Sequence, residues 1–118
     1  MDAKRNTYRK EMNAFITRIK DMRQGNEEAM DAYRTFSRAV LEPGALDTKT
    51  KELICLSLSV AALCDGCIGF HTKGALNAGA TREEIVEALR VTVLMGGGPS
   101  YIYAAHVLDA VDELTQSA

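Results

Sequence analysis

The sequence predicts an all-α protein, and three observations support that class. Hydrophobic residues recur at steps of three and four in several separate segments, which is the period of an amphipathic helix. Glycine and proline separate these segments, and the Thr-x-x-Glu pattern beginning at Thr81 is typical of a capped helix start. No alternation of strand and helix patterns is present, which argues against a parallel sheet. We therefore expect about six helices in a single domain covering residues 1–118.

Two amphipathic helices are expected in the first third of the chain. Residues 3–24 carry one apolar stripe with Lys and Arg on the other side, and Gly25 is placed to end that helix. A second helix is expected over residues 27–41, after which Pro43 and the following glycine break the pattern. The stripes consist of Met12, Phe15, Ile16, Ile19 and Met22 in the first helix, and of Met30, Tyr33, Ser37 and Val40 or Leu41 on the inner face of the second.

A third helix is expected from the candidate N-cap Asp47 to about residue 63, and it holds the longest apolar-rich stretch of the chain. Part of that stretch alternates as a strand would. Its length favours a helix that is buried nearly all round, with its serines bonded back to the backbone. The Cys-x-x-Cys segment interrupts this helix, and a short helix is expected to resume at Cys67 and to continue to about residue 77.

Two more helices complete the expected fold. One begins after Thr81 and carries apolar residues as far as Leu94, where the Gly-Gly-Gly-Pro sequence of residues 96–99 stops it. The last covers about residues 100–114. The glycine run does not follow a strand, so it is interpreted as a helix break rather than a phosphate-binding loop. No organic cofactor is expected.

The composition indicates a cytoplasmic protein that binds neither nucleic acid nor a membrane. The formal net charge is −2 and the isoelectric point about 5.7, so no basic surface is expected for phosphates. The apolar-rich stretch at 53–63 is shorter than the ~20 residues of a membrane span, and the N-terminus lacks the apolar run of a secretory signal. Three cysteines, a small and odd number, argue against a secreted disulfide scaffold.

The residues most suited to chemistry are Cys64, Cys67 and His71. Two thiols separated by two residues can close a disulfide with little backbone movement, and a cysteine at the start of a helix has a lowered pKa. His71 follows Cys67 by four residues, so the two share one helical face and the imidazole can take the thiol proton. This pattern favours a thiol-dependent peroxidase or disulfide reductase.

Two other classes stay open on these residues. Cys64, Cys67 and His71 are also three zinc ligands, and Cys55 or His106 could supply a fourth, which would make the chain a metal-binding assembly module. The second class is a decarboxylase of a small cyclic acid. That enzyme would need cationic groups at its site, and only Lys73 lies near the motif.

The remaining polar candidates have ordinary structural interpretations. From its spacing alone, Glu52 is a first-turn glutamate that the helix dipole favours. Cys55 lies in the apolar stretch and is expected to be an inert core residue. His106 is expected in packing or at an interface, and Tyr101 and Tyr103 are expected to line a groove or a subunit contact.

The chain from about residue 43 to 114 resembles a known family in its motifs. A glutamate, a Cys-x-x-Cys pair twelve residues later and a histidine four residues after the second cysteine occur in that order. The matching segments are Pro43-Gly44, Leu46-Asp47, Lys51-Glu52-Leu53, Cys64-Asp65-Gly66-Cys67-Ile68-Gly69-Phe70-His71, Gly79-Ala80-Thr81, Glu83-Glu84-Ile85 and Gly96-Gly97. On these residues the chain resembles the carboxymuconolactone decarboxylase/alkylhydroperoxidase D-like family.

The resemblance implies a role for each residue of the motif. Cys67 corresponds to the thiol that attacks a hydroperoxide, and Cys64 to the partner thiol that closes the disulfide. His71 and Glu52 take the positions of the family's proton relay. Asp65-Gly66 stands between the cysteines, where peroxidase members can carry a histidine, and the decarboxylase branch generally lacks the cysteine pair.

The resemblance also implies the partners. They are a small hydroperoxide, a dithiol or protein disulfide reductant, and further copies of the chain in a trimer or hexamer. The composition independently favours such assembly, because a short chain without Trp and with 6% aromatic residues builds a thin core and leaves apolar surface.

Overall fold

The computed structural model describes residues 7–116, and every regular element within that range is an α-helix. The six helices of this range are α1 (Tyr8–Arg23), α2 (Glu27–Leu41), α3 (Thr48–Ala61), α4 (Asp65–Asn77), α5 (Arg82–Gly96) and α6 (Gly98–Thr115). The all-α class and the expected number of helices are therefore confirmed. None of the described helices is both long and apolar enough to cross a bilayer.

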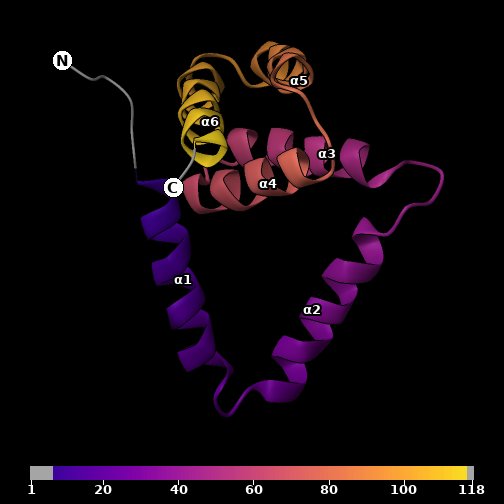
Figure 1. Cartoon of the computed structure of the whole chain (residues 1–118), viewed down its shortest axis with the longest axis vertical. Coiled ribbons are helices and arrows are strands. Elements are labelled where there is room, and N and C mark those ends of the chain that lie inside the picture. Colours follow the sequence, from indigo (N-terminus) through magenta and orange to yellow (C-terminus); the bar gives the residue numbers. More distant parts are fainter. Residues whose placement is uncertain (1–6, 117–118) are drawn as a thin grey trace.

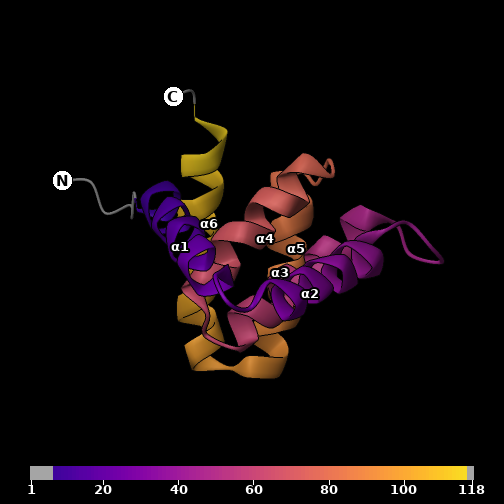
Figure 2. The same ribbon diagram turned by 90° about the horizontal axis from the view of Figure 1, so that it is seen from below.

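The helices divide into a packed body and a V-shaped hairpin. Helices α1 and α2 form the V, α3 and α4 lie side by side across its open end, and α5 and α6 lie on the far side of that pair (Figures 1 and 2). Helix α4 packs against α3, α6 and α1, whereas α2 has its main contact with α3. The core accordingly lies among α3 to α6 and the first turns of α1.

The core is small and mostly aliphatic, as the composition predicts. Its largest fully buried side chain is Tyr8, in the first turn of α1, whose burial is not predicted by the apolar stripe expected for this helix. The other large side chains that are almost completely buried are Leu56, Val60, Ile68, Thr72, Ile85 and Val107. These residues come from α3, α4, α5 and α6, so the two central helices are held between neighbours on both sides.

Helix α1 is fastened to the body by a buried carboxylate. Glu113 on α6 is 5% exposed, and its two oxygens accept the backbone N–H groups of Tyr8 at 3.1 Å and Arg9 at 3.0 Å. The residue before the helix, Thr7, makes no side-chain capping bond. Glu113 therefore satisfies free donors at the start of α1 and places a negative charge at the positive end of that helix.

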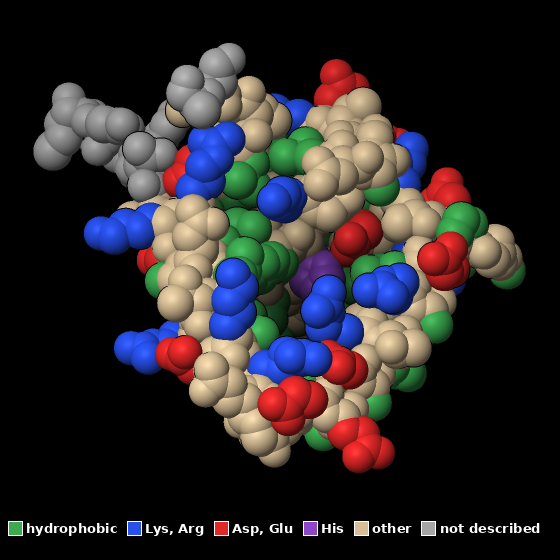
Figure 3. Space-filling view, turned by 60° about the horizontal axis from the view of Figure 1, so that its bottom comes forward, with side chains coloured by type: hydrophobic (Ala, Val, Ile, Leu, Met, Phe, Trp, Pro, Cys, Tyr) green, Lys and Arg blue, Asp and Glu red, His purple; other side chains and the backbone are tan. Residues whose placement is uncertain are grey.

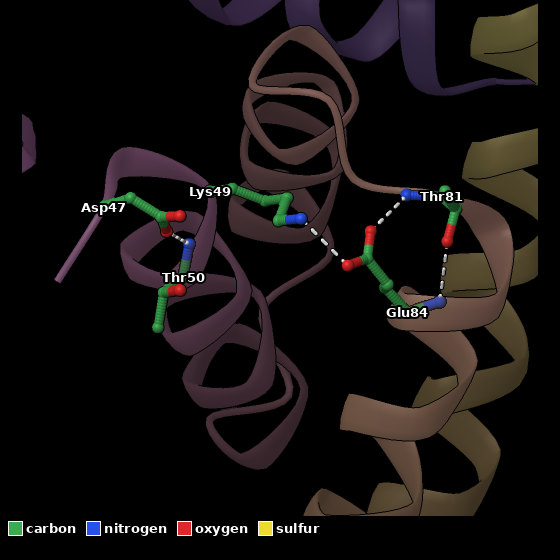
Figure 4. A network of polar contacts seen from close by, with 5 residues as sticks. All are labelled: Asp47, Lys49, Thr50, Thr81 and Glu84. Atoms are coloured by element: carbon green, nitrogen blue, oxygen red, sulfur yellow. Dashed lines mark hydrogen bonds and ion pairs between the residues drawn. The ribbon is translucent and has the colours of Figure 1, made fainter.

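The starts of α3 and α5 are tied together by a polar network (Figure 4). Asp47 accepts the backbone N–H of Thr50 at 2.8 Å, which confirms it as the N-cap of α3. Thr81 and Glu84 form the predicted capping box of α5. Lys49 donates to Glu84 at 2.9 Å, and this hydrogen bond is the largest of the contacts that lower the pKa of the Glu84 carboxyl. The network fixes the first turns of α3, directly before Glu52.

Two expectations about burial are wrong within a single copy of the chain. Helix α2 has no buried residue, because its apolar stripe meets α3 along one edge only. Met30, Ser37 and Leu41 on that edge are half-buried, and Tyr33, Phe36 and Val40 on the other edge are exposed. Helix α3 is not buried all round either, since Ile54 and Leu58 are exposed. The expected hydrogen bond from a serine to the helix backbone does occur, because the Ser59 hydroxyl donates to the Cys55 carbonyl oxygen at 2.7 Å.

Candidate active site

The two cysteines of the motif meet at the N-terminus of α4. Cys64 is the N-cap, its Sγ accepts the backbone N–H of Cys67 at 3.2 Å, and the two residues are joined as a disulfide with their Cα atoms 5.3 Å apart. The helix begins at Asp65, two residues before the predicted start at Cys67. Both sulfur atoms therefore lie at the positive end of α4, and the helix dipole favours a thiolate at either position.

Glu52 and His71 form a second pair, built across the α3–α4 contact. The Glu52 Oε1 atom lies 2.7 Å from the His71 Nδ1 atom, and Glu52 is 8% exposed. Gly74, one turn after His71, makes room for the carboxylate, because a Cβ atom there would overlap the Glu52 side chain. An ionised carboxylate only accepts hydrogen bonds, so Nδ1 carries the proton and the lone pair of the neutral ring lies on Nε2.

One turn of α4 connects the two pairs. Cys67 and His71 are both within this helix and four residues apart, so their side chains lie on the same face. The side chain of His71 is 32% exposed, which leaves part of the imidazole open to solvent. The arrangement brings a dithiol, an oriented imidazole and a buried carboxylate to one side of α4.

Cys55 belongs to the same region, contrary to its expected place in the core. It is half-buried, and its Sγ atom lies within 4.8 Å of a ligand atom from each of Glu52 and His71. Burial raises the pKa of the Cys55 thiol, and the negative charge of Glu52 raises it further. The signal for this position was the three-residue step from Glu52, which places both side chains on one face of α3.

Asp65, between the cysteines, links the dithiol segment to α1 and α6. It accepts a hydrogen bond from the Tyr8 hydroxyl at 2.8 Å, and its Oδ1 atom lies 3.0 Å from His106 Nδ1. The ring of His106 packs on Tyr103, with centroids 4.7 Å apart. His106 is therefore a packing residue, as expected, that also makes a polar contact with Asp65. Tyr101, which is expected to line a groove or a subunit contact, is exposed in a single copy of the chain.

A cavity of about 380 Å³ opens elsewhere, between α1, α4 and α6. Its polar lining residues are Arg9, Asn13, Lys73 and Asn77, and its apolar ones are Met12, Ile16, Leu76 and Leu114. Lys73 is two residues after His71, which rotates its side chain by roughly 200° about the helix axis. The cavity therefore lies on the opposite side of α4 from His71.

Figure 3 shows the face between α1 and α2, where a histidine lies in a hollow with Lys and Arg around it.

A protein-family model matches most of the chain. The model of the carboxymuconolactone decarboxylase family covers residues 27–110, which include all four motif residues. An uncharacterized protein of Cupriavidus necator is 41% identical over 91 residues, or 77% of this chain and 80% of that protein. Uncharacterized protein 4 of the cox locus of Paracoccus denitrificans is 40% identical over 84 residues, or 71% of this chain and 76% of that protein.

Solved structures are similar over most of the fold. The apo form of lpg0406, a carboxymuconolactone decarboxylase family protein of Legionella pneumophila, matches with a TM-score of 0.91 and 40% identity over 95% of this chain and 100% of that one. A structure of TM1620 from Thermotoga maritima matches with a TM-score of 0.68 and 35% identity over 73% of this chain and 89% of that one. An involvement of TM1620 in the antioxidative response has been suggested.

Proposed function

Because this chain belongs to the carboxymuconolactone decarboxylase family, we propose that it is an oxidoreductase that uses its dithiol to reduce hydroperoxides. The observation that carries the proposal is the Cys64–Cys67 disulfide beside the Glu52–His71 pair, since it joins a redox couple to an oriented base. The suggested antioxidative role of the similar Thermotoga maritima protein supports the same class of activity.

The first step is attack of the Cys67 thiolate on a hydroperoxide. Nε2 of His71 takes the thiol proton, while Nδ1 keeps its contact with Glu52 and the carboxylate balances the imidazolium charge. The sulfur attacks the terminal, hydrogen-bearing oxygen of the hydroperoxide, a new S–O bond forms and the O–O bond breaks. The leaving alkoxide takes a proton from His71, so the products are Cys67 sulfenic acid and an alcohol, or water when the substrate is hydrogen peroxide.

The second step regenerates a disulfide. The Cys64 sulfur attacks the sulfenic sulfur, the S–O bond breaks, and water leaves with the Cys64 proton. The short Cα–Cα distance of 5.3 Å supports this closure without rearrangement of α4. An external dithiol or protein reductant then attacks the disulfide, forms a mixed disulfide, and leaves both cysteines reduced and itself oxidised.

The cysteine pair also bears on the two other classes. By resemblance, the decarboxylase branch of the family generally lacks the pair, so its presence here argues for redox chemistry. As an assembly module, the chain would need both sulfur atoms of the pair as thiolate ligands for zinc, whereas the structure joins them to each other. Neither a decarboxylase nor a zinc-binding module needs a disulfide, whereas the proposed reaction forms one and reduces it again.

Consumption of hydroperoxides tests the proposal. Purified full chain is mixed with hydrogen peroxide, an alkyl hydroperoxide or an organic disulfide, together with a panel of dithiol reductants. We expect turnover that depends on the dithiol and that disappears in the Cys64→Ser/Cys67→Ser double variant. Lys73→Ala, on the opposite side of α4, is the control and keeps the wild-type rate. Equal rates in the wild type and the double variant would rule out the proposed function.

A further inference from the structure

Three side chains with different metal-binding groups converge beside the dithiol. Glu52, Cys55 and His71 each bring one ligand atom into a group whose members all lie within 4.8 Å of one another. A carboxylate oxygen, a sulfur and an imidazole nitrogen are all ligands of Zn²⁺ in proteins. We propose that these three residues form a binding site for a zinc-like divalent cation. This site differs from a Cys64–Cys67 zinc centre, because it uses neither cysteine of the motif.

The distances suit a tetrahedral ion after small side-chain movements. Bonds of 2.0–2.3 Å to such an ion place its ligand atoms roughly 3.3–3.8 Å apart. The Glu52 Oε1 and His71 Nδ1 atoms, now 2.7 Å apart, would have to separate slightly, and Nδ1 would release its proton to solvent as the ion binds. The more distant ligand atoms would have to approach. Rotations of the side chains would have to supply both changes, because each ligand stands on a helix that packs into the body of the fold.

The two helices hold the ligands in place. Glu52 and Cys55 are three residues apart on α3, so they project from one face. His71 approaches from α4, the most extensively packed neighbour of α3. Glu52 is 8% exposed and Gly74 leaves it room, so the carboxylate is available in the cluster instead of pointing into solvent. Ligands that rest on packed helices are well ordered before the ion arrives.

The exposure of the cluster allows an ion to enter and leaves a coordination position for water. The His71 side chain is 32% exposed and Cys55 is half-buried, so the site is open on one side. Three protein ligands with one position open to water is the arrangement of catalytic zinc sites rather than closed structural ones. A bound ion would also occupy the Glu52–His71 pair. Binding itself does not depend on the proposed peroxidase activity.

The disulfide makes the site testable without interference from the motif. When Cys64 and Cys67 are bonded to each other, Cys55 is the one free thiol among the three cysteines of the sequence. Any thiolate bound to a metal in the fully oxidised protein must then be Cys55. Co²⁺ is the suitable probe, because it takes zinc-like tetrahedral geometry and shows a sulfur-to-cobalt absorption band.

The experiment titrates the oxidised full chain with Co²⁺ in the absence of peroxide. We expect the sulfur-to-cobalt band to rise to one equivalent per chain and to vanish when Zn²⁺ is added. Cys55→Ser should lose the band, and His71→Ala and Glu52→Gln should each weaken cobalt binding by at least tenfold. His106→Ala is the matched control, because His106 also lies against a carboxylate, Asp65, and should bind cobalt as the wild type does.

Two results would overturn the metal site. One is the absence of the sulfur-to-cobalt band in the oxidised wild type. The other is a band that His71→Ala and Glu52→Gln both leave at wild-type affinity, which would mean that Cys55 binds cobalt without them. Helix content measured by circular dichroism verifies that each variant is folded. A peroxidase assay plays no part here, so a failure of the proposed function would leave this test intact.

Discussion

A single contact of 2.7 Å decides which nitrogen of His71 carries the proton. Because the Glu52 carboxylate accepts from Nδ1, the Nε2 atom is the one that can take a proton from a thiol. Glu52 is buried and His71 is partly exposed, so the pair combines a fixed orientation with access to solvent. This division of roles explains why both residues would be needed although only the imidazole would receive the proton.

The pH dependence of the first oxidation step follows from this pair. In His71→Ala the Cys67 thiol has no base, so oxidation by peroxide at pH 7 should slow by roughly 100-fold. The rate should recover as the pH rises, because the thiol then ionises without help. Stopped-flow measurement of a single oxidation gives the profile, and Lys73→Ala is the control. A uniform loss at all pH values would contradict the role of His71 as a base.

The raised pKa of Cys55 predicts how its alkylation depends on pH. In the oxidised protein, alkylation of Cys55 should begin at higher pH than that of free cysteine, because burial and Glu52 disfavour the thiolate. Glu52→Gln should move the profile part of the way back. The sign for stability follows, since a thiol with a raised pKa in the folded state favours folding at low pH and loses this contribution as the pH rises. Mass spectrometry of iodoacetamide-treated protein measures the rate.

At the scale of single residues, the sequence predicts chemical groups better than their contacts. The cysteine pair and His71 are recognisable from spacing, but Glu52 gains its role only through resemblance. The contact of Glu113 with Tyr8 spans 105 residues, and no local pattern indicates it. Cys55 looked like a core residue because its neighbours in sequence are apolar, and only the packing of α3 on α4 shows what its side chain faces.

At the scale of elements, the period of the hydrophobic residues predicts every helix but not every boundary. The sequence predicts the capping box at Thr81 and the N-cap at Asp47 correctly, because their bonds are local. The start of α4 was predicted at Cys67 and lies at Asp65, because a cysteine sulfur takes the capping position that Ser, Thr, Asp or Asn usually fills. The burial of α2 was predicted wrongly, since an amphipathic stripe does not reveal which partner covers it.

A single substitution tests how Glu113 attaches α1 to the body of the fold. Glu113→Ala leaves two N–H groups at the start of α1 without their buried acceptor, and the free energy of unfolding should fall by about 1–3 kcal/mol. Urea denaturation measures the change, and hydrogen exchange should quicken in α1. Glu87→Ala on the exposed side of α5 is the control and should have little effect. An unchanged exchange rate in α1 would show that other contacts hold this helix.

The whole molecule exposes more surface than a compact folded monomer of the same mass. Its accessible area is 7883 Å², whereas a folded monomer of 12.9 kDa exposes roughly 6300 Å². The radius of gyration of 14.9 Å similarly exceeds the roughly 13.5 Å of a compact chain of this length. The V of α1 and α2 extends away from the packed body (Figure 1), and its apolar side chains Phe15, Tyr33 and Phe36 are each more than half exposed.

The exposed edge of α2 therefore predicts assembly. We expect a trimer or hexamer in solution, because copies of the chain can cover the apolar side chains that one copy leaves open. Phe36→Glu, on the exposed edge, should shift the mass toward the monomer. Thr35→Glu, roughly 100° around the same helix from Phe36 and outside the apolar edge of Tyr33 and Val40, is the matched control and should keep the wild-type mass. Light scattering at micromolar concentration decides it, and a monomeric wild type would contradict the expectation.

In the proposed reaction, Cys67 attacks the peroxide and Cys64 resolves the product. The helix dipole favours a thiolate at both positions, so the proximity of His71 to Cys67 must make the difference. The most direct measurement treats reduced Cys64→Ser and Cys67→Ser proteins with one equivalent of hydroperoxide, in the presence of a sulfenic acid trap, and locates the adduct by mass spectrometry. We predict one adduct on Cys67 in Cys64→Ser and almost none in Cys67→Ser. An adduct on Cys64 in Cys67→Ser, with none on Cys67 in Cys64→Ser, would reverse the assignment, and no adduct in either variant would contradict the peroxidase mechanism.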